Sequence, residues 1–245
     1  MITTGWAKTI FKYTGLGLLV FILGILVIGF VILRREYNKF QSNQADANLD
    51  LTQSGTLNAD GLVSQSYSLL NGWNFVAFPF EPVSFTSAAN LITEIAKNGG
   101  FVSTVSSWDG DRWIEFSQSG ADQYGQDFPI VPGRAYFLRS HQEYAWKVYG
   151  KPLTALPALT FSQGWNAIGF IPADPSKAEN ILDAINHGTD NAREIDHWWS
   201  GSWDVFVKRT YNPNNIKSYG NNFIIDPTKG YMLSLQSPAT YEGGE

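Results

Sequence analysis

The chain has 245 residues, of which 44% are hydrophobic and 16% charged, and it contains no cysteine. The lack of cysteine excludes disulfides and thiolate chemistry. Residues 1–39 carry 5 Lys and Arg against 1 Glu, and the remainder carries 12 against 21 Asp and Glu. Because this acidic remainder repels polyanions, we expect no nucleic acid among its partners.

The first predicted element is an apolar helix. Residues 15–33 form an unbroken run of 19 apolar or glycine residues, flanked by Lys12 and by Arg34 and Arg35. Such a run is long enough to cross a bilayer, whereas a signal peptide has a shorter apolar core with a cleavage site close behind it. The sequence therefore predicts a transmembrane anchor over 1–40 that contacts membrane lipid through 15–33. Lys and Arg are nearly equally frequent on the two sides of the apolar run, so the positive-inside rule does not fix the orientation. The β-rich composition of the rest of the chain favours an extracytoplasmic C-terminal domain.

A polar segment follows the predicted anchor. Residues 41–65 are rich in Gln, Asn, Ser, Thr and Asp and show no sustained apolar period, which is typical of a linker or stalk. The spacing of Asp46, Asp50 and Asp60 matches no compact cage of oxygen ligands, so we expect no metal site there.

Most of the remaining chain is one module written twice. Gly72-Trp73-Asn74 returns as Gly164-Trp165-Asn166. Further matches are Ala88 with Ala178, Asn90 with Asn180, Ile95 with Ile185, Trp108 with Trp198, Trp113 with Trp203, Phe128 with Phe223, Pro132 with Pro227 and Tyr136 with Tyr231. The offset drifts between 90 and 95 residues, as expected when loops tolerate insertions better than the elements they join. We predict two homologous repeats, 66–152 and 153–245.

Each repeat is expected to begin with a strand and a helix. Residues 73–80 indicate a mostly buried strand, which places Trp73, and by the same argument Trp165, in the core. In the first repeat, a helix capped by Thr86 or Ser87 is predicted to end near Lys97.

The second helix has its own start and stop signals. Asp174 is the predicted N-cap, Pro175 the first helical residue and Gly188 the stop.

Two hairpins and closing strands complete the prediction. Residues 102–116 and 195–207 each form two strands around a turn dipeptide, Asp109-Gly110 in the first repeat and Ser200-Gly201 in the second. Closing strands are predicted over 134–139, 144–149 and 230–235, with a short one near Tyr241. The predicted fold class is α+β and strand-dominated, with one N-terminal transmembrane helix followed by two homologous antiparallel-sheet-plus-helix repeats.

The order of motifs in the repeats resembles a known kind of surface module. A Gly-Trp-Asn string, an apolar run, a helix, a tryptophan hairpin and the segment Pro132-Gly133-Arg134-Ala135-Tyr136 follow one another. This order is similar to that of the tandem Gly-Trp-Asn repeat modules of bacterial and archaeal cell-surface and S-layer-associated proteins, over roughly residues 66–245. The second copy departs from it at 227–231, where the glycine moves next to the tyrosine. The resemblance implies an exported, non-catalytic envelope module and supplies no active residues.

Catalytic patterns are weak. Asp109, Asp111 and Glu115 lie near Trp108 and Trp113, and a glycosidase uses two such carboxylates. Positions 199 and 201 of the second copy are Trp and Gly, which favours a hairpin turn with solvated acids instead.

Other catalytic signatures are missing from the sequence. Asp196 and His197 are neighbours in a strand, so their side chains point to opposite faces. The chain shows no nucleophile elbow, phosphate loop or zinc-protease pattern. We therefore expect no enzyme, no catalytic residues, no metal and no cofactor.

The tryptophan hairpins are the best candidates for interaction. Trp198 and Trp199 are consecutive, so one of them must leave the buried face of a regular strand. The candidate interaction residues are Trp108, Trp113, Trp198, Trp199 and Trp203. The alternative is that these rings pack against the other repeat.

Three functions fit these observations. The first is a single-pass, membrane-anchored, extracytoplasmic structural or interaction protein, a subunit of a cell-envelope or membrane-associated assembly with a protein partner or a second copy of itself. The second is a membrane-tethered carbohydrate-binding module, which predicts a planar row of exposed aromatic rings facing a glycan. The third is a pilin-like filament subunit, although the apolar run lacks the acidic residue of bacterial pilins. We expect the first.

Overall fold

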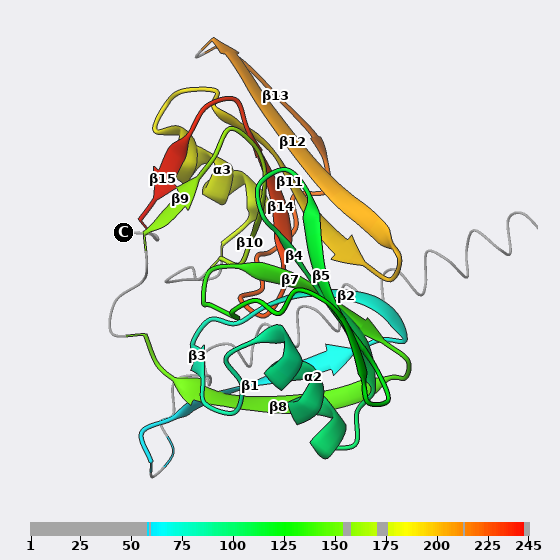
Figure 1. Ribbon diagram of the computed structural model, residues 1–245. Coiled ribbons are helices and arrows are strands. Elements are labelled where there is room, and N and C mark those ends of the chain that lie inside the picture. The colour runs from blue at the N-terminus through cyan, green and yellow to red at the C-terminus, as the bar shows by residue number, and fades with distance from the viewer. Residues whose placement is uncertain (1–57, 59, 154–157, 171–175, 213, 243–245) are drawn as a thin grey trace, which may run out of the picture. The chain divides into compact units, whose positions relative to one another are not determined.

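The structure, a computed structural model, describes residues 58, 60–153, 158–170, 176–212 and 214–242. All of these belong to one compact unit, Ser54–Glu245. Antiparallel strands dominate it (Figure 1). The strand-dominated part of the predicted fold class therefore fits.

The first repeat contains eight strands and one helix: β1 (Val63–Leu69), β2 (Gly72–Ala77), β3 (Glu81–Pro82), α2 (Ala88–Lys97), β4 (Val102–Trp108), β5 (Trp113–Ser119), β6 (Asp122–Gly125), β7 (Ala135–Ser140) and β8 (Tyr144–Lys151). The described part of the second contains β9 (Leu159–Phe161), β10 (Gly164–Ile168), α3 (Ala178–Asn186), β11 (Ala192–Trp199), β12 (Ser202–Asn212), β13 (Asn215–Gly220), β14 (Tyr231–Leu235) and β15 (Ala239–Tyr241).

The fold class needs a correction in its helical part. No helix among the described residues is long and apolar enough to cross a membrane. Helices α2 and α3 have 10 and 9 residues, so each spans roughly 15 Å against a hydrocarbon core of about 30 Å. The described fold is thus strand-dominated with two short helices, and the predicted transmembrane helix is not supported. The apolar run 15–33 on which it rested lies outside the described residues.

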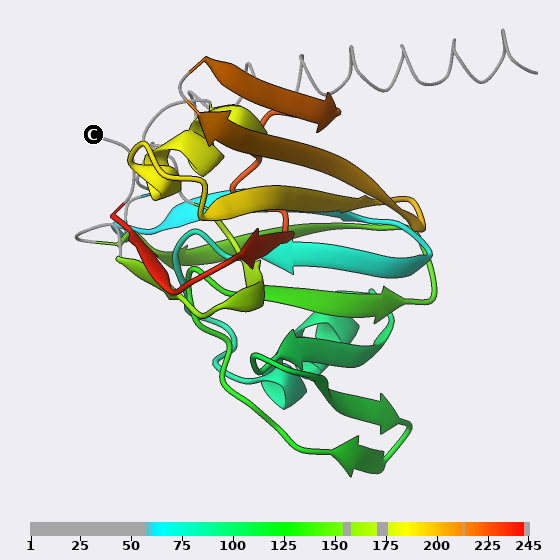
Figure 2. The same ribbon diagram turned by 90° about the horizontal axis from the view of Figure 1, so that it is seen from above.

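Both repeats use the same sheet topology. The five-stranded sheets have the orders β2-β7-β4-β5-β6 and β10-β14-β11-β12-β13, and each repeat adds a smaller sheet, β1-β8-β3 or β15-β9. In two views α2 and α3 lie on opposite sides of the unit, with the five-stranded sheets between them (Figures 1 and 2). Each helix packs on one face of its own sheet and encloses a hydrophobic core there. The other face of each five-stranded sheet is left for the other repeat to cover.

The Gly-Trp-Asn motif has the same role in both repeats. Gly72 and Gly164 have φ angles of 105° and 89°, which favour glycine. The Asn74 side chain accepts from the Leu70 amide and donates to the Leu70 carbonyl, both at 2.8 Å. Asn166 makes the same two bonds to Ser162 at 2.9 Å. The motif therefore closes the tight connection into β2 and into β10.

The predicted helix start is confirmed in the first repeat and wrong in the second. Ser87 caps α2, and its hydroxyl accepts from the Asn90 amide. Helix α3 begins after Lys177 without a side-chain cap, and the predicted start at 174–175 lies outside the described residues. Its Glu179 amide donates instead to Asn222 Oδ1, 43 residues away. Local sequence rules cannot detect a cap supplied from such a distance.

Five strands escaped prediction. Strand β1 begins at Val63, inside the segment predicted as linker, and buries only Tyr67 and Leu69. Strands β6 and β13 are exposed along their whole length, and β3 and β9 have two and three residues. Strands β3, β6, β9 and β13 are either exposed throughout or too short to show hydrophobic alternation, whereas β1 does alternate, with Val63, Tyr67 and Leu69 on one side.

Candidate functional site

The two repeats join through reciprocal contacts. Trp108 Nε1 donates to the Trp165 carbonyl at 2.9 Å, and Trp198 Nε1 donates to the Trp73 carbonyl at 2.9 Å. Trp108 and Trp198 are equivalent positions of the two repeats, as are Trp73 and Trp165. The backbone repeats this pattern, with Ala77 N donating to Thr228 O and Gly169 N to Gly133 O. The repeats are therefore related by an approximate two-fold axis at their junction.

Small residues lie on this axis. A Cβ atom on Gly169 would be 2.2 Å from the Cβ of Ala77, its equivalent in the first repeat. A Cβ atom on Gly230 would be 2.8 Å from the Cβ of Ala135, again its equivalent. Two alanines do not fit at either place without a shift of the neighbouring atoms, so at least one member of each pair must be glycine for this packing.

A pocket of about 280 Å³ opens beside this junction. Its lining residues are Trp73, Ser106, Trp113, Glu115, Phe137, Trp198 and Trp203. The last two come from the β11–β12 hairpin, and the other five come from β2, β4, β5 and β7 of the first repeat. The volume is close to the lower end of ligand pockets, about 300–1,000 Å³. We call this site the junction pocket.

Strand register explains why these side chains meet. Phe137 lies opposite Ser106, and Ser106 lies opposite Glu115, so the three form one row across β7, β4 and β5. Trp113 is two residues before Glu115 and shares its face of the sheet. This is the face that α2 leaves uncovered. The hairpin of the second repeat reaches over it.

The aromatic rings form walls rather than a flat platform. The Phe137 ring makes edge contacts with Trp113, Trp198 and Trp203 at interplanar angles of 62°, 88° and 79°. Trp198 and Trp203 meet each other at 71°. Trp73 and Trp203 remain 37% and 39% exposed, so the pocket is open to solvent. The pocket is an open hollow in the surface, and indole rings make up most of its lining.

One carboxylate contributes the charge of the pocket. Glu115 Oε1 accepts a hydrogen bond from Ser106 Oγ at 3.0 Å, and Ser106 is buried. Within the described ranges, Glu115 forms no ion pair with a Lys, Arg or His side chain. The nearby Arg139 is not part of the lining, and its guanidinium lies 5.8 Å from the centroid of the Trp73 ring.

The structure separates the predicted interaction residues into three groups. Trp113, Trp198 and Trp203 line the junction pocket. Trp108 is half-buried beside Trp113 and bonds across the junction. Trp199 points to the other face of β11, where Lys229 lies 5.8 Å from its ring centroid.

Sequence reasoning missed several lining residues and misplaced two tryptophans. Ser106 and Phe137 were not singled out, and Glu115 was considered only as a catalytic acid. The prediction that Trp73 and Trp165 are core residues is wrong, because they are 37% and 36% exposed. Both stand on the sheet face opposite the helix, and strand periodicity does not show which face a helix covers. The recurrence of both tryptophans in the Gly-Trp-Asn motif was the one sequence signal that could have marked Trp73 as a candidate site residue.

The opposite side of the two-fold axis carries different chemistry. Asp196, Val205 and Met232 occupy the positions equivalent to Ser106, Glu115 and Phe137. Asp196 is 8% exposed, and its Oδ1 has no hydrogen-bond partner among the described residues. Burial, with Glu194 and Asp204 nearby, raises the pKa of Asp196 to about 7. The two sides of the junction are therefore not equivalent as sites.

The neighbouring His197 faces the helix side of the sheet. It is 7% exposed and packs against the rings of Phe223 and Tyr231. Burial, reinforced by the charge of Lys229, lowers the pKa of His197 to about 4. Its position on the other face of β11 removes it from the junction pocket.

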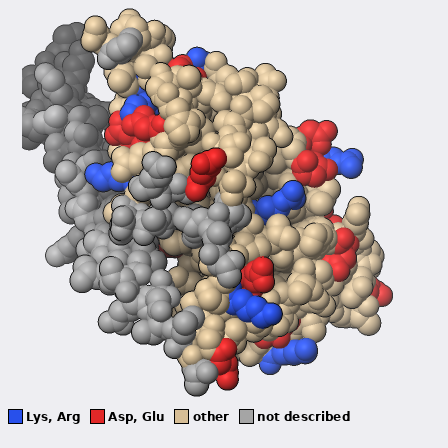
Figure 3. All heavy atoms as spheres, turned by 90° about the vertical axis from the view of Figure 1, so that its left-hand side faces the viewer, with Lys and Arg blue, Asp and Glu red and all other residues tan. Residues whose placement is uncertain are grey.

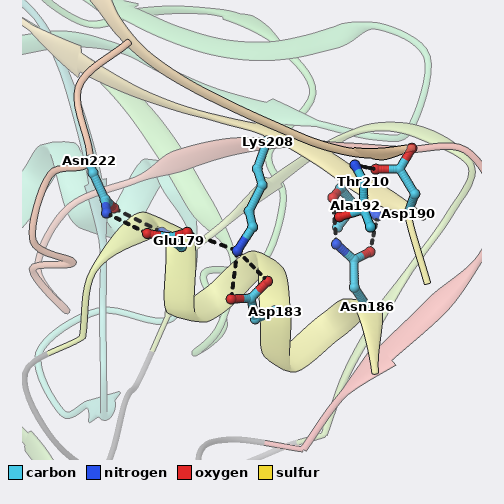
Figure 4. Close-up of polar contacts among 8 residues, drawn as sticks. All are labelled: Glu179, Asp183, Asn186, Asp190, Ala192, Lys208, Thr210 and Asn222. Atoms are coloured by element: carbon cyan, nitrogen blue, oxygen red, sulfur yellow. Dashed lines mark hydrogen bonds and ion pairs between the residues drawn. The ribbon is translucent and has the colours of Figure 1, made fainter. Parts of the chain in front are cut away.

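A second polar cluster has a structural role. Lys208 on β12 places its ammonium 2.8 Å from carboxylate oxygens of Glu179 and Asp183 on α3 (Figure 4). Asn186 exchanges two hydrogen bonds with the backbone of Ala192. Burial lowers the pKa of Lys208, but the hydrogen bonds to Asp183 and Glu179 outweigh it and raise the value. These paired groups hold α3 on the second sheet.

Other possible sites are less developed. A pocket of about 470 Å³ beside β3 is lined mainly by aliphatic, proline and phenylalanine side chains and carries no tryptophan. In the described part of the chain, no group of three or more His, Cys, Asp or Glu could hold a metal ion. On the described surface of the face in Figure 3, acidic and basic side chains are interspersed. The junction pocket is therefore the candidate site.

Comparison with family models, with curated proteins and with solved structures finds no match to this chain. The resemblance to tandem Gly-Trp-Asn modules stays a prediction, and the functional argument rests on the junction pocket itself.

Proposed function

We propose that the two repeats act together as a non-catalytic binding module, whose junction pocket receives a group that protrudes from a partner. The observation that carries this proposal is the open, mainly aromatic pocket to whose lining both repeats contribute. Concave sites with aromatic walls and a few placed polar groups are typical of ligand binding. The extracytoplasmic interaction role expected from the sequence is kept as part of this proposal.

The arrangement of acids favours binding over hydrolysis. A glycosidase needs two carboxylates on either side of the scissile bond, and Glu115 is the acid that lines the pocket. Asp109 accepts hydrogen bonds from the amides of Asp111 and Arg112 within the β4–β5 turn. The Asp109 carboxylate therefore stabilises the β4–β5 turn.

The ring geometry argues against the carbohydrate alternative in its simple form. A flat platform for sugar stacking requires nearly coplanar exposed rings. The lining rings of Trp198 and Trp203 meet at 71° instead. A compact group fits between such walls better than an extended glycan chain does.

A matched pair of variants tests the proposal. Trp73 and Trp165 occupy equivalent positions and have nearly equal exposure, 37% and 36%, but Trp73 lines the pocket and Trp165 does not. The purified full chain is screened by ligand-observed NMR against sugars, methylated amines and short peptides. We expect Trp73→Ala to abolish binding of a hit and Trp165→Ala to retain it. Equal effects of both substitutions on every hit, or no hit at all, would refute the proposal.

A further inference from the structure

Resting on the proposed binding function, we infer that the junction pocket recognises a methylated ammonium group, of which the trimethylammonium head of choline is the model. Four indole rings and one carboxylate surround a space of about 280 Å³. Aromatic boxes of this kind hold quaternary ammonium groups through the negative faces of their rings, and indole gives the strongest attraction.

The ring angles suit a small cation. A cation gains from each ring whose face it lies over within about 6 Å of the ring centroid, so rings set at different angles can act on one group together. Trp198 and Trp203 meet each other at 71°, so the faces of these two lining rings are directed differently. The guanidinium of Arg139 lies 5.8 Å from the centroid of the Trp73 ring, so the other three indoles are the rings left to a ligand cation.

The charge of the pocket is complementary to such a group. Glu115 is held by Ser106 and has no cationic partner among the described side chains. A cation entering the pocket would supply the missing counter-charge. Because Glu115 is exposed, water and salt screen this attraction, which should therefore weaken as the ionic strength rises.

The small number of polar side chains in the pocket favours a methylated ammonium over a bare one. A bare ammonium loses hydration at three N–H donors and needs an acceptor for each, but the pocket lining has only Ser106 and Glu115 as polar side chains outside its indole N–H groups. A sugar needs partners for several hydroxyls. A quaternary ammonium has a positive charge without any N–H donor, so burying it leaves no unpaired donor.

The chain should bind one such group. On the opposite side of the junction, Val205 replaces Glu115 and Met232 replaces Phe137, so neither the exposed carboxylate nor the phenyl wall is present there. A stoichiometry of one per chain is therefore part of the inference.

Choline and a neutral compound of the same shape provide the test. Isothermal titration of the purified full chain is carried out with choline chloride and with 3,3-dimethylbutan-1-ol, in which carbon replaces the charged nitrogen. We expect choline to bind at one site and the alcohol to bind at least about tenfold more weakly. Glu115→Gln should weaken choline at least about fivefold and leave the alcohol unchanged, because it keeps the shape and removes the charge. Trp165→Ala, outside the pocket, should bind choline as the unmodified chain does.

The outcomes separate this inference from the proposed function. Equal binding of choline and the alcohol, or choline binding that is insensitive to Glu115→Gln, would overturn the ammonium inference. If choline fails to bind but another ligand is lost in Trp73→Ala and kept in Trp165→Ala, the binding function stands and the ligand class is wrong. If no ligand shows that difference, both are wrong. Circular dichroism confirms that each variant is folded, and Glu115 is an exposed residue whose replacement by Gln keeps its hydrogen-bond acceptor.

Discussion

Replacing Asp196 by Asn should stabilise the protein at alkaline pH. The Asp196 carboxyl is buried, and its pKa rises from 3.8 to about 7. Between these values the folded state binds a proton that the unfolded state does not, so the free energy of unfolding falls as pH rises through this window. A shift of about 3 units corresponds to about 4 kcal/mol of lost stability above pH 7. Asn keeps the size of the side chain and cannot ionise, so it removes this cost.

The titration of His197 has the opposite effect on the pH dependence of stability. Its pKa falls from 6.5 to about 4, so between these values the unfolded state binds the extra proton and stability rises with pH. The shift is worth about 3 kcal/mol with the opposite sign to that of Asp196. In the unmodified chain the two contributions nearly cancel from about pH 4 to about pH 6.5. In Asp196→Asn only the rise due to His197 remains.

Urea unfolding followed by tryptophan fluorescence measures both effects. At about pH 8, Asp196→Asn should be more stable than the unmodified chain by up to about 4 kcal/mol, and at about pH 4 the two should be nearly equal. His197→Gln is the matched variant, and its stability should fall as pH rises from 4 to 7. If the difference between Asp196→Asn and the unmodified chain is the same at both pH values, Asp196 does not titrate as argued.

Three further experiments test the junction and the helix contact by urea unfolding. Gly169→Ala should cost about 1–3 kcal/mol by overpacking, and adding Ala77→Gly should restore most of it; additive losses would show that the two positions do not share one space. Trp198→Phe removes the indole donor to the Trp73 carbonyl and should cost about 1–2 kcal/mol, whereas no loss would mean that this bond contributes nothing. Lys208→Gln should cost about 1 kcal/mol in low salt and less in high salt, because Asp183 stays 55% exposed and hydrated; a loss independent of salt would assign it to packing.

Local elements could be predicted because local rules decide them. Ser87 caps α2 through a bond to a residue three positions away, and the Asp109-Gly110 turn lies between two strands that pair with each other. Internal matching of Gly72-Trp73-Asn74 with its copy revealed equivalent elements. In each case the partner of a residue lies within a few positions, or its pattern repeats visibly along the chain.

The junction pocket depends on contacts that no local rule contains. Trp73 and Trp203 lie 130 positions apart, and Glu115 became a pocket residue only when the second hairpin covered its face of the sheet. Period-2 alternation tells which side chains share a face but not which face meets a helix, solvent or the other repeat. By itself, the sequence determined the order of most elements and the duplication. The tertiary structure decided which indoles are buried, which join the repeats and which surround an open space, because those outcomes depend on how two distant sheets pack.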